Sequence, residues 1–313
     1  MVQGGLGWAY SGLNTNPAIG GKRDDASSAF TVIKLSPAVA WKVCDELSLG
    51  VALGVNSFSG NQELFPNSSA GPSPSFPTGF AGIRFKDAKG IGLNSKWGLQ
   101  YHPMPDVTFG VTYGTQTSIP LRNGTLRINF SDPAFGSLGI VRYDNAKLTG
   151  LRLPEELAVG LAFRPTQNLL ISLQDKWYNW SDAIGKLKIT ATNPRTPGAP
   201  ASVVIPSAVD FVDQHVIEMG IAYDWSNDTV LTLGVNHGSR PIPDNNVSPI
   251  FIPIQARHYM FGARRQLEDG WYVAGILEWF ATQSVTYDSA VFGPRANEHH
   301  LGDVLHISIG RNW

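Results

Sequence analysis

Apolar and polar side chains alternate along most of this chain. In the segment 46–55 the odd positions carry Leu or Val, and the even positions from 48 onward carry Ser, Gly or Ala. The segments 106–115 and 216–225 repeat the pattern, with aromatic residues joining the apolar row. Because successive side chains of a strand point to opposite faces, each segment predicts a strand with one apolar face and one face of small or polar residues.

The alternation recurs often enough to predict about twelve strands, most of them about 10–15 residues long. The further segments are 93–101, 157–163, 169–180, 229–237, 258–264, 271–280 and 305–313, with weaker candidates at 5–11 and 30–43. Soluble strands average about five or six residues, whereas a tilted strand that crosses a bilayer needs roughly 9–11. Strand length therefore favours an all-β fold, a transmembrane antiparallel β-barrel that forms a single domain over residues 1–313.

The predicted connections alternate between short and long. Tight turns fall near 44–45, 103–105, 165–167, 225–228 and 266–270. Long segments rich in Pro, Gly, Asn and Ser lie near 12–28, 61–91, 120–154, 182–211, 240–253 and 285–298. This is the pattern of short periplasmic turns and long extracellular loops in outer-membrane barrels.

Aromatic residues support a membrane-spanning barrel. Each tight turn has one on its flank, as expected for a girdle at a membrane boundary: Trp41, Tyr101, Phe163, Tyr223 and Trp271. In the last predicted strand Leu305, Ile307, Ile309 and the terminal Trp313 share one face. An aromatic terminus with alternate apolar residues before it resembles the C-terminal signal of outer-membrane barrels.

Composition narrows the class further. Charged residues make up 16% of the chain, below the roughly 25% of soluble domains. No run of about 20 apolar residues predicts a membrane helix. A soluble β-sandwich is the alternative, but its outer faces need more charge than these strands carry.

Charge and metal-binding residue types exclude several functions. The net charge of −1 gives no electrostatic case for a nucleic-acid partner. The single cysteine, Cys44, supplies neither a disulfide framework nor a metal cluster. His299 and His300 are adjacent, so on a strand they point to opposite faces and cannot chelate one ion. The sequence predicts no metal and no cofactor.

Several stretches resemble one family, the FadL/TodX-type outer-membrane transporters. They are Leu35-Ser-Pro-Ala-Val-Ala-Trp-Lys42, Asp45-Glu-Leu-Ser-Leu-Gly50, Leu153-Pro-Glu-Glu-Leu-Ala-Val-Gly160, Phe163-Arg-Pro165 and Trp177-Tyr-Asn-Trp-Ser-Asp182, followed by a similar layout from Asp213 to the end. The resemblance implies a barrel of fourteen strands plugged by an N-terminal hatch. Because about twelve strands are predicted here, we expect this chain to lack the signal peptide, the hatch and the first hairpin.

The resemblance also implies a function, and no enzymatic activity. Such a protein takes up long-chain fatty acids or aromatic hydrocarbons passively across the bacterial outer membrane, by capture in an apolar loop groove and lateral release from the barrel. It is expected to act as a monomer among outer-membrane lipid and lipopolysaccharide. The groove is expected within 61–91 and 120–154, where apolar residues are frequent for exposed loops: Leu64, Phe65, Phe76, Phe80, Phe130, Phe135, Leu138 and Ile140. In the lumen Lys96, Gln100, Glu218 and Arg264 are candidates, and Lys96 or Arg264 could meet a ligand carboxylate.

Other functions stay open at this point. His237 and Ser239 share an outward face, the spacing of the lipid-facing pair in twelve-stranded outer-membrane phospholipases. A general porin for polar solutes would need a more charged lumen than these rows of Gly, Ala, Ser and Thr. A purely structural or adhesive barrel would bind no ligand.

Overall fold

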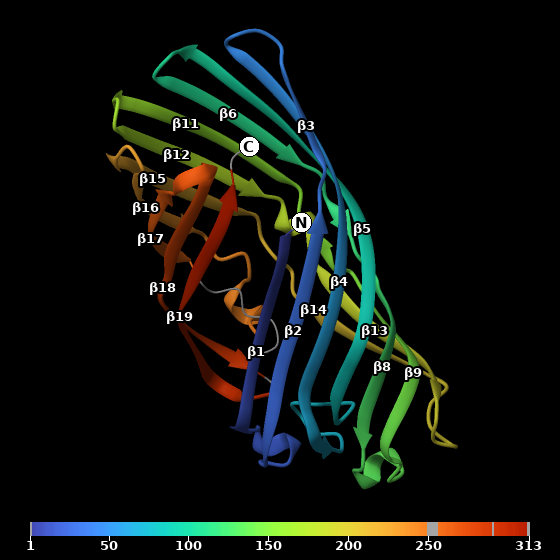
Figure 1. The fold of residues 1–313 in the computed structure, drawn as a ribbon. Helices are drawn as coiled ribbons and strands as arrows, with labels where there is room; N and C mark the ends of the chain where they lie inside the picture. The colour runs from blue at the N-terminus through green and yellow to red at the C-terminus, as the bar shows by residue number, and fades with distance from the viewer. Residues whose placement is uncertain (1, 249–255, 290, 312–313) are drawn as a thin grey trace.

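The computed structural model describes residues 2–248, 256–289 and 291–311, and most of them lie in antiparallel strands (Figure 1). The strands are β1 (Val2–Asn14), β2 (Arg23–Leu35), β3 (Ala38–Lys42), β4 (Leu47–Ala70), β5 (Phe80–Met104), β6 (Val107–Gly114), β7 (Thr117–Ser118), β8 (Leu121–Phe130), β9 (Gly139–Thr149), β10 (Arg152–Leu153), β11 (Glu156–Thr166), β12 (Leu169–Tyr178), β13 (Lys186–Pro194), β14 (Ser202–Ala208), β15 (Gln214–Ser226), β16 (Thr229–Gly238), β17 (Arg257–Gln266), β18 (Trp271–Ser289) and β19 (Gly293–Arg311). The helical turns are α1 (Trp180–Ala183), η1 (Pro17–Ile19), η2 (Pro133–Phe135), η3 (Asp244–Asn246) and η4 (Glu268–Gly270). In this described part, no helix is long and apolar enough to cross a membrane.

In the described residues the strands group into twelve passes, where a pass is one traverse from one end of the barrel wall to the other, because several traverses are interrupted rather than ended. The interrupted passes are β2 with β3, β6 through β8, β9 through β11, β12 with β13, and β14 with β15. The other seven passes are single strands: β1, β4, β5, β16, β17, β18 and β19. The prediction of a transmembrane antiparallel barrel with about twelve strands is confirmed.

The sheet that forms the barrel wall divides at β5, because one part of β5 pairs with β6 and another part pairs with β8. At one level the ladder runs β3–β4–β5–β6–β11–β12–β15–β16–β17–β18–β19. At the other level it runs β1–β2–β4–β5–β8–β9–β13–β14. In Figure 1, β8, β9 and β13 accordingly diverge from β6, β11 and β12. Within the described ranges no ladder joins β1 to β19, but Tyr10 Oη lies 3.1 Å from His300 Nε2 between these two strands.

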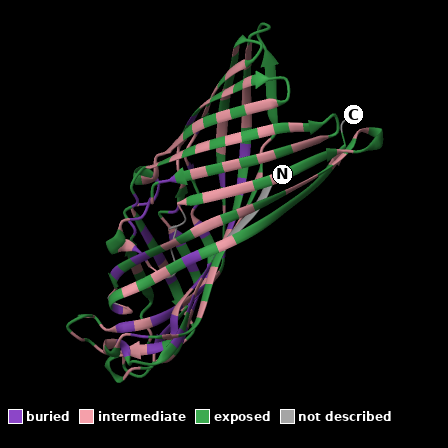
Figure 2. Ribbon diagram, turned by 90° about the vertical axis from the view of Figure 1, so that its left-hand side faces the viewer, coloured by how far each residue is buried: buried purple, intermediate pink, exposed green. Residues whose placement is uncertain are grey.

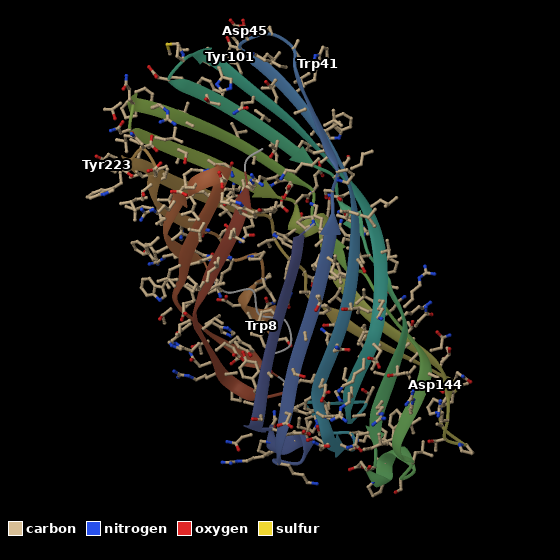
Figure 3. All side chains as sticks on the ribbon, in the orientation of Figure 1. Trp8, Trp41, Asp45, Tyr101, Asp144 and Tyr223 are labelled. Atoms are coloured by element: carbon tan, nitrogen blue, oxygen red, sulfur yellow. The ribbon has the colours of Figure 1, made fainter. Side chains whose placement is uncertain are left out.

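The two ends of the wall differ as the sequence predicts. We call one the turn end, where short connections follow β3, β5, β11, β15 and β17. We call the opposite end, which contains the hairpins of β4 with β5, β8 with β9 and β13 with β14, the hairpin end. The aromatic residues flanking the short turns are all exposed: Trp41, Tyr101, Phe163, Tyr223 and Trp271. Figure 3 shows Trp41 and Tyr101 near Asp45 at the turn end, with Tyr223 farther away on the left-hand side of the view. Such a row of aromatics fits a membrane interface.

The outward apolar residues lie in register from strand to strand. One such row passes through cross-strand partners on seven neighbouring strands: Phe109, Leu161, Leu173, Met219, Val235, Tyr259 and Trp279. Along this row Leu173 is 47% exposed and Met219 is 53% exposed. A soluble sandwich would bury such rows between two sheets, so this alternative is wrong. The apolar belt suits contact with lipid.

Four segments predicted as long loops are largely strand, which corrects the sequence interpretation of 61–91, 120–154, 182–211 and 285–298; the last contains the adjoining ends of β18 and β19. The other three contain the hairpin-end halves of β4 and β5, the hairpin of β8 and β9, and the hairpin of β13 and β14. Their inward side chains are buried, as the concentration of buried residues at this end in Figure 2 shows. The frequent Gly, Pro and Asn residues concealed an alternation that tertiary packing stabilises.

Two further expectations about strands need comment. The predicted strand 30–43 is interrupted between β2 and β3 at Ser36 and Pro37, because a proline nitrogen has no hydrogen to donate to a ladder. The terminal Trp313 lies outside the described residues.

Candidate functional site

A cavity of about 330 Å³ lies at the hairpin end, inside the wall. Strand alternation builds it: Leu187 and Ile189 of β13 point inward, whereas Lys188 between them is exposed. Most of the side chains that line the cavity are apolar: Leu64, Ile83, Leu148, Leu187, Ile189, Ile205, Val209, Val247 and Val291. Concave apolar walls with few polar groups are typical of sites for small hydrophobic ligands.

The polar groups at the cavity are almost all neutral. Asn246 donates its side-chain N–H to Val209 O at 3.0 Å, so part of its hydrogen-bonding capacity is used. Asp288 carries the one formal charge among the described lining residues, and its carboxylate accepts the backbone N–H of Arg295 at 3.0 Å. No Lys, Arg or His belongs to this described lining. A ligand carboxylate would therefore meet no cation here, whereas an uncharged ligand avoids the free-energy cost of burying an unpaired charge.

On the side of the cavity that faces the turn end lies a layer where four passes leave the barrel wall. We call it the crossover layer, defined as residues 115–120, 150–155, 179–185 and 209–213. Its apolar residues Ile119, Leu151, Ile184 and Phe211 are buried in the same core cluster. Backbone hydrogen bonds join it, from Ile119 N to Leu151 O at 3.1 Å and from Phe211 N to Ile184 O at 2.9 Å. Along the chain this layer stands between the membrane-level strands β6, β11, β12 and β15 and the hairpin-end strands β8, β9, β13 and β14.

Glycines on β5 make room for the crossover layer. A Cβ on Gly92 would lie 2.4 Å from Thr117 Cγ2, and a Cβ on Gly90 would lie 2.6 Å from Pro120 O. Any side chain at either position would collide with the segment 117–120 as it passes the inner face of β5. Gly90 and Gly92 are thus required by close packing.

At membrane level the lumen is lined by small residues. A second cavity of about 420 Å³ lies against the inner rows of β6, β11, β12, β15, β16 and β17. Glycines form much of its wall: Gly110, Gly160, Gly220 and Gly234. These are the even-position faces that the sequence predicts to be small or polar.

Two pairs of opposite charge lie on the inner face at this level. Lys96 Nζ lies 2.7 Å from Glu156 Oε1, and Lys176 Nζ lies 2.8 Å from Glu218 Oε1. Gln174 donates a further hydrogen bond to Glu218 at 2.9 Å. In the described part of the chain, no group of three or more His, Cys, Asp or Glu side chains could hold a metal ion.

One further lumen cluster was not predicted from the sequence. Glu278 of β18 lies between two histidines, with His258 Nδ1 at 2.8 Å and His306 Nε2 at 3.0 Å. The ladder places all three on the inner face, since His258 pairs with Phe280 and His306 with Ile276. Their even positions in 258–264, 271–280 and 305–310 were a usable signal, because most of the odd positions there are apolar or aromatic.

The four lumen candidates from the sequence lie on the inner face but do not converge, and Glu218 is held by Lys176 and Gln174. Lys96 is held by Glu156, and Gln100 stands between its ladder partners Ser48 and Gly110. The guanidinium of Arg264 lies 4.2 Å from the ring centre of Tyr272, where a cation–π contact stabilises it. Their contact with a ligand stays a prediction.

The apolar candidates from the hairpin end divide into two groups. Leu64 lines the cavity. The others pack against protein. Phe65 and Phe80 are buried in a small second core, against which Phe76 and Phe292 pack. The rings of Phe130 and Phe135 meet edge-to-face with their centres 5.5 Å apart, and Leu138 packs against the main core. Ile140 is 57% exposed. Among these candidates Leu64 alone is a cavity residue, and ligand contact by the rest stays a prediction.

Several cavity residues escaped sequence reasoning. Leu187, Ile189, Ile205 and Val209 fall in 182–211, which was interpreted as a loop. The alternation Lys-Leu-Lys-Ile-Thr-Ala-Thr from position 186 was the signal that could have identified them. It is short, and the prolines that follow it obscure it.

The geometry gives the phospholipase alternative little support. β16 ends at Gly238, so Ser239 lies beyond the strand. Its hydroxyl accepts the backbone N–H of His215 at 3.3 Å. No hydrogen bond between His237 and Ser239 occurs in the described structure.

Comparisons with known proteins agree with this architecture. The sequence family described as "Outer membrane protein transport protein (OMPP1/FadL/TodX)" matches residues 10–268. A search of curated proteins finds no significant match.

Solved structures share the fold. The structure described as "TodX deltaS2S3 mutant monoaromatic hydrocarbon channel" gives a TM-score of 0.79 at 18% identity, over 99% of this chain and 78% of that one. The Ralstonia pickettii toluene transporter TbuX gives 0.73 at 14% identity, over 99% and 77%. A Pseudomonas aeruginosa FadL homologue gives 0.66 at 14% identity, over 90% and 68%. At such low identities these likenesses show the fold alone.

Proposed function

This chain belongs to the outer membrane protein transport family that includes FadL and TodX, and on that premise we propose that it takes up uncharged hydrophobic molecules passively across the outer membrane. The hairpin-end cavity carries the proposal, because its walls are apolar and its described lining holds no cation. Aromatic hydrocarbons are the ligand class that fits this chemistry. The structures of TodX and TbuX are described as those of toluene transporters.

Long-chain fatty acids are the second candidate class. The family profile names FadL alongside TodX, and Lys96 and Arg264 were the predicted partners of a carboxylate. Lys96, however, already contacts Glu156, and Arg264 lies over Tyr272. A fatty acid would have to displace these contacts or leave its carboxylate at the cavity without a cation. Both cost free energy, and a neutral ligand avoids that cost.

The proposed route has three stages. A ligand is captured in the hairpin-end cavity and passes the apolar crossover layer, where side-chain motion opens the way. It is then released sideways from the barrel into the membrane. An axial route would take it past the charged pairs Lys96–Glu156 and Lys176–Glu218. Lateral transfer to lipid keeps an apolar molecule out of water and away from ions.

A general porin for polar solutes is the competing function. It needs a continuous aqueous path, and we propose that the buried apolar residues of the crossover layer interrupt that path. The two functions differ in conductance across a planar bilayer. We expect no bulk ion current from this protein.

Ligand binding by the purified protein in detergent micelles tests the proposal. We expect toluene to bind more tightly than palmitate, measured by equilibrium dialysis of radiolabelled ligands. In Ile205→Arg a cation enters the cavity wall, so toluene binding should fall and palmitate binding should rise. Val204→Arg is the matched control, because Val204 is the preceding residue of β14 and is 60% exposed.

Three outcomes would contradict the proposal. Palmitate binding to the unmodified protein at or above the affinity for toluene would refute the preference for neutral ligands. Equal effects of the two arginine variants would refute the assignment of the cavity. Absence of binding by both ligands, together with ion conductance, would favour the porin.

A further inference from the structure

A basic surface covers the outer side of the hairpin end. We call it the basic face, meaning the outward rows of β5, β8, β9 and β13 at that end. Its central residues are Arg84, Lys86, Lys89, Arg122, Arg127 and Arg142. The whole chain carries a net charge of −1, so this concentration of cations is a local feature.

Burial of the alternate residues shows that these side chains face outward. Phe85 and Leu126 are 0% exposed in the main core, and each directly precedes or follows a basic residue of β5 or β8. On β13, Leu187 is 5% exposed between Lys186 and Lys188. Since neighbours on a strand point to opposite faces, the basic side chains lie on the outer surface. Figure 3 shows Asp144, which belongs to this surface, at the outer flank of the molecule.

Like charges oppose one another across the strands of the basic face. Arg84 pairs with Arg127, which pairs in turn with Arg142, and Lys89 pairs with Arg122. Like charges at directly opposite positions destabilise a sheet. The arrangement therefore carries a cost that a bound polyanion would relieve.

Two carboxylates offset part of this charge. Glu63 lies 3.0 Å from Arg84 and 2.8 Å from Lys86, and Asp144 contacts Arg142 and Arg195. Each acid is thus shared by two cations, which leaves an excess of positive charge. In the described structure Lys89, Arg122 and Arg127 form no ion pair with a carboxylate. Beside them a polar groove of about 370 Å³ opens between β8, β9 and β13, with Arg122 and Lys147 in its lining.

The basic face begins where the apolar belt ends. On β5 the outward row contains Tyr101, Leu99, Trp97, Ser95, Leu93 and Ile91, and the next outward residue is Lys89. Ser95 is the one polar member before Lys89, and its hydroxyl accepts the indole N–H of Trp97, while the last apolar member, Ile91, is 69% exposed. Ten residues at about 3.3 Å each, on a strand tilted by about 40°, span about 25 Å of bilayer. This matches the hydrocarbon band of an outer-membrane barrel, and it places Lys89 at the level of the lipid headgroups.

We infer that the basic face binds the phosphorylated headgroup of lipopolysaccharide in the outer leaflet. Long hairpins of outer-membrane barrels lie on the extracellular side, where this glycolipid is the polyanion beside the wall. Arginine presents a planar fork that binds phosphate oxygens in pairs, and several arginines in register can hold several phosphates of one lipid. The inference is independent of the transported ligand, because the basic side chains point away from the cavity.

Binding of purified lipid A to the full chain in detergent micelles tests this inference. The variant Lys89→Gln/Arg122→Gln/Arg127→Gln removes three cations that have no carboxylate partner in the described structure. The control Arg23→Gln/Arg257→Gln/Arg295→Gln removes three exposed cations outside the basic face. Native mass spectrometry counts bound lipid A, its dephosphorylated form and phosphatidylglycerol on each protein. Urea unfolding of every variant, followed by tryptophan fluorescence, checks that the fold is intact independently of any transported ligand.

We expect lipid A affinity to fall at least tenfold in the basic-face variant and to change little in the control. Dephosphorylated lipid A should bind the unmodified protein as weakly as lipid A binds the basic-face variant. Three results would overturn the inference: equal losses in the two variants, unchanged binding in the basic-face variant, or phosphatidylglycerol binding as tightly as lipid A. The last would assign the surface to anionic lipids in general.

Discussion

Replacing Gly92 by alanine is a sharp test of how the crossover layer packs. The added Cβ would lie 2.4 Å from Thr117 Cγ2 and 2.9 Å from both Ile119 Cγ1 and Ser118 O. Thr117 and Ile119 are 1% and 0% exposed, and Ser118 contributes a backbone atom, so these neighbours have little room to move. Overpacking of this kind costs about 1–3 kcal/mol.

A second effect of the substitution has the opposite sign. Alanine restricts the unfolded chain more than glycine does, which stabilises a protein by about 0.4–1 kcal/mol where the native backbone permits the change. The φ angle of Gly92 lies outside the left-handed region, so this gain applies. We therefore expect Gly92→Ala to lower the free energy of unfolding by roughly 0–2.6 kcal/mol, or about 1.3 kcal/mol at the midpoints of the two ranges.

Gly110→Ala is the matched control. A Cβ at Gly110 meets no atom within 4 Å, so only the gain remains and stability should rise slightly. Urea unfolding of each protein, refolded in detergent and followed by tryptophan fluorescence, measures both. If Gly92→Ala proved as stable as Gly110→Ala, the segment 117–119 would not cross the inner face of β5, and the reasoning would fail.

Three further predictions follow from single contacts. Phe65→Ala should lower the free energy of unfolding by about 3–5 kcal/mol, because its buried ring is lost, whereas Phe135→Ala should cost clearly less since that ring is half-buried; urea unfolding compares them. Hydrogen bonds from Arg195 and Arg142 hold the pKa of Asp144 below its ordinary value of 3.8. The stabilisation that Asp144 gives the β9 hairpin is therefore present above pH 3.8 and is lost as pH falls through the lowered pKa. Hydrogen exchange of β9 amides should accelerate only in strong acid, and a change near neutral pH would contradict this. Glu156→Gln leaves Lys96 without its partner at partly exposed positions, so stability should change by no more than about 1 kcal/mol, and a larger loss in thermal melts would show that the pair is more isolated from water than the geometry indicates.

The membrane-level half of the fold could be predicted from local pattern alone. In 46–55, 106–115 and 216–225 alternate residues form one apolar row and one row of small or polar residues. The apolar row faces lipid and the other row faces the lumen. Each strand shows that contrast in its own sequence, so the contrast can be recognised without knowing the neighbouring strands. The tight turns and their aromatic flanks are equally local.

The hairpin end could not be predicted in this way. Leu187 and Ile189 read as parts of a loop because prolines, glycines and asparagines lie close to them in 182–211. Their role as cavity walls depends on Leu148 and Ile205, residues of other passes that the ladder brings alongside. The same is true of the aromatic candidates: Phe65 packs edge-to-face on Phe292 at 5.2 Å, a contact between residues far apart in the chain.

By itself, the sequence determined a lipid-facing antiparallel barrel, its alternation of short and long connections, and membership of a transport family. The barrel and its connections follow from repeats of residue type along single strands and turns, whereas the family follows from the similarity of whole sequence stretches to other members. Tertiary structure alone decided where four passes leave the wall, why Gly90 and Gly92 must be glycine, and which cations gather on one outer face. The physical reason is that such features depend on distances between different strands, and no single strand encodes how its neighbours will approach.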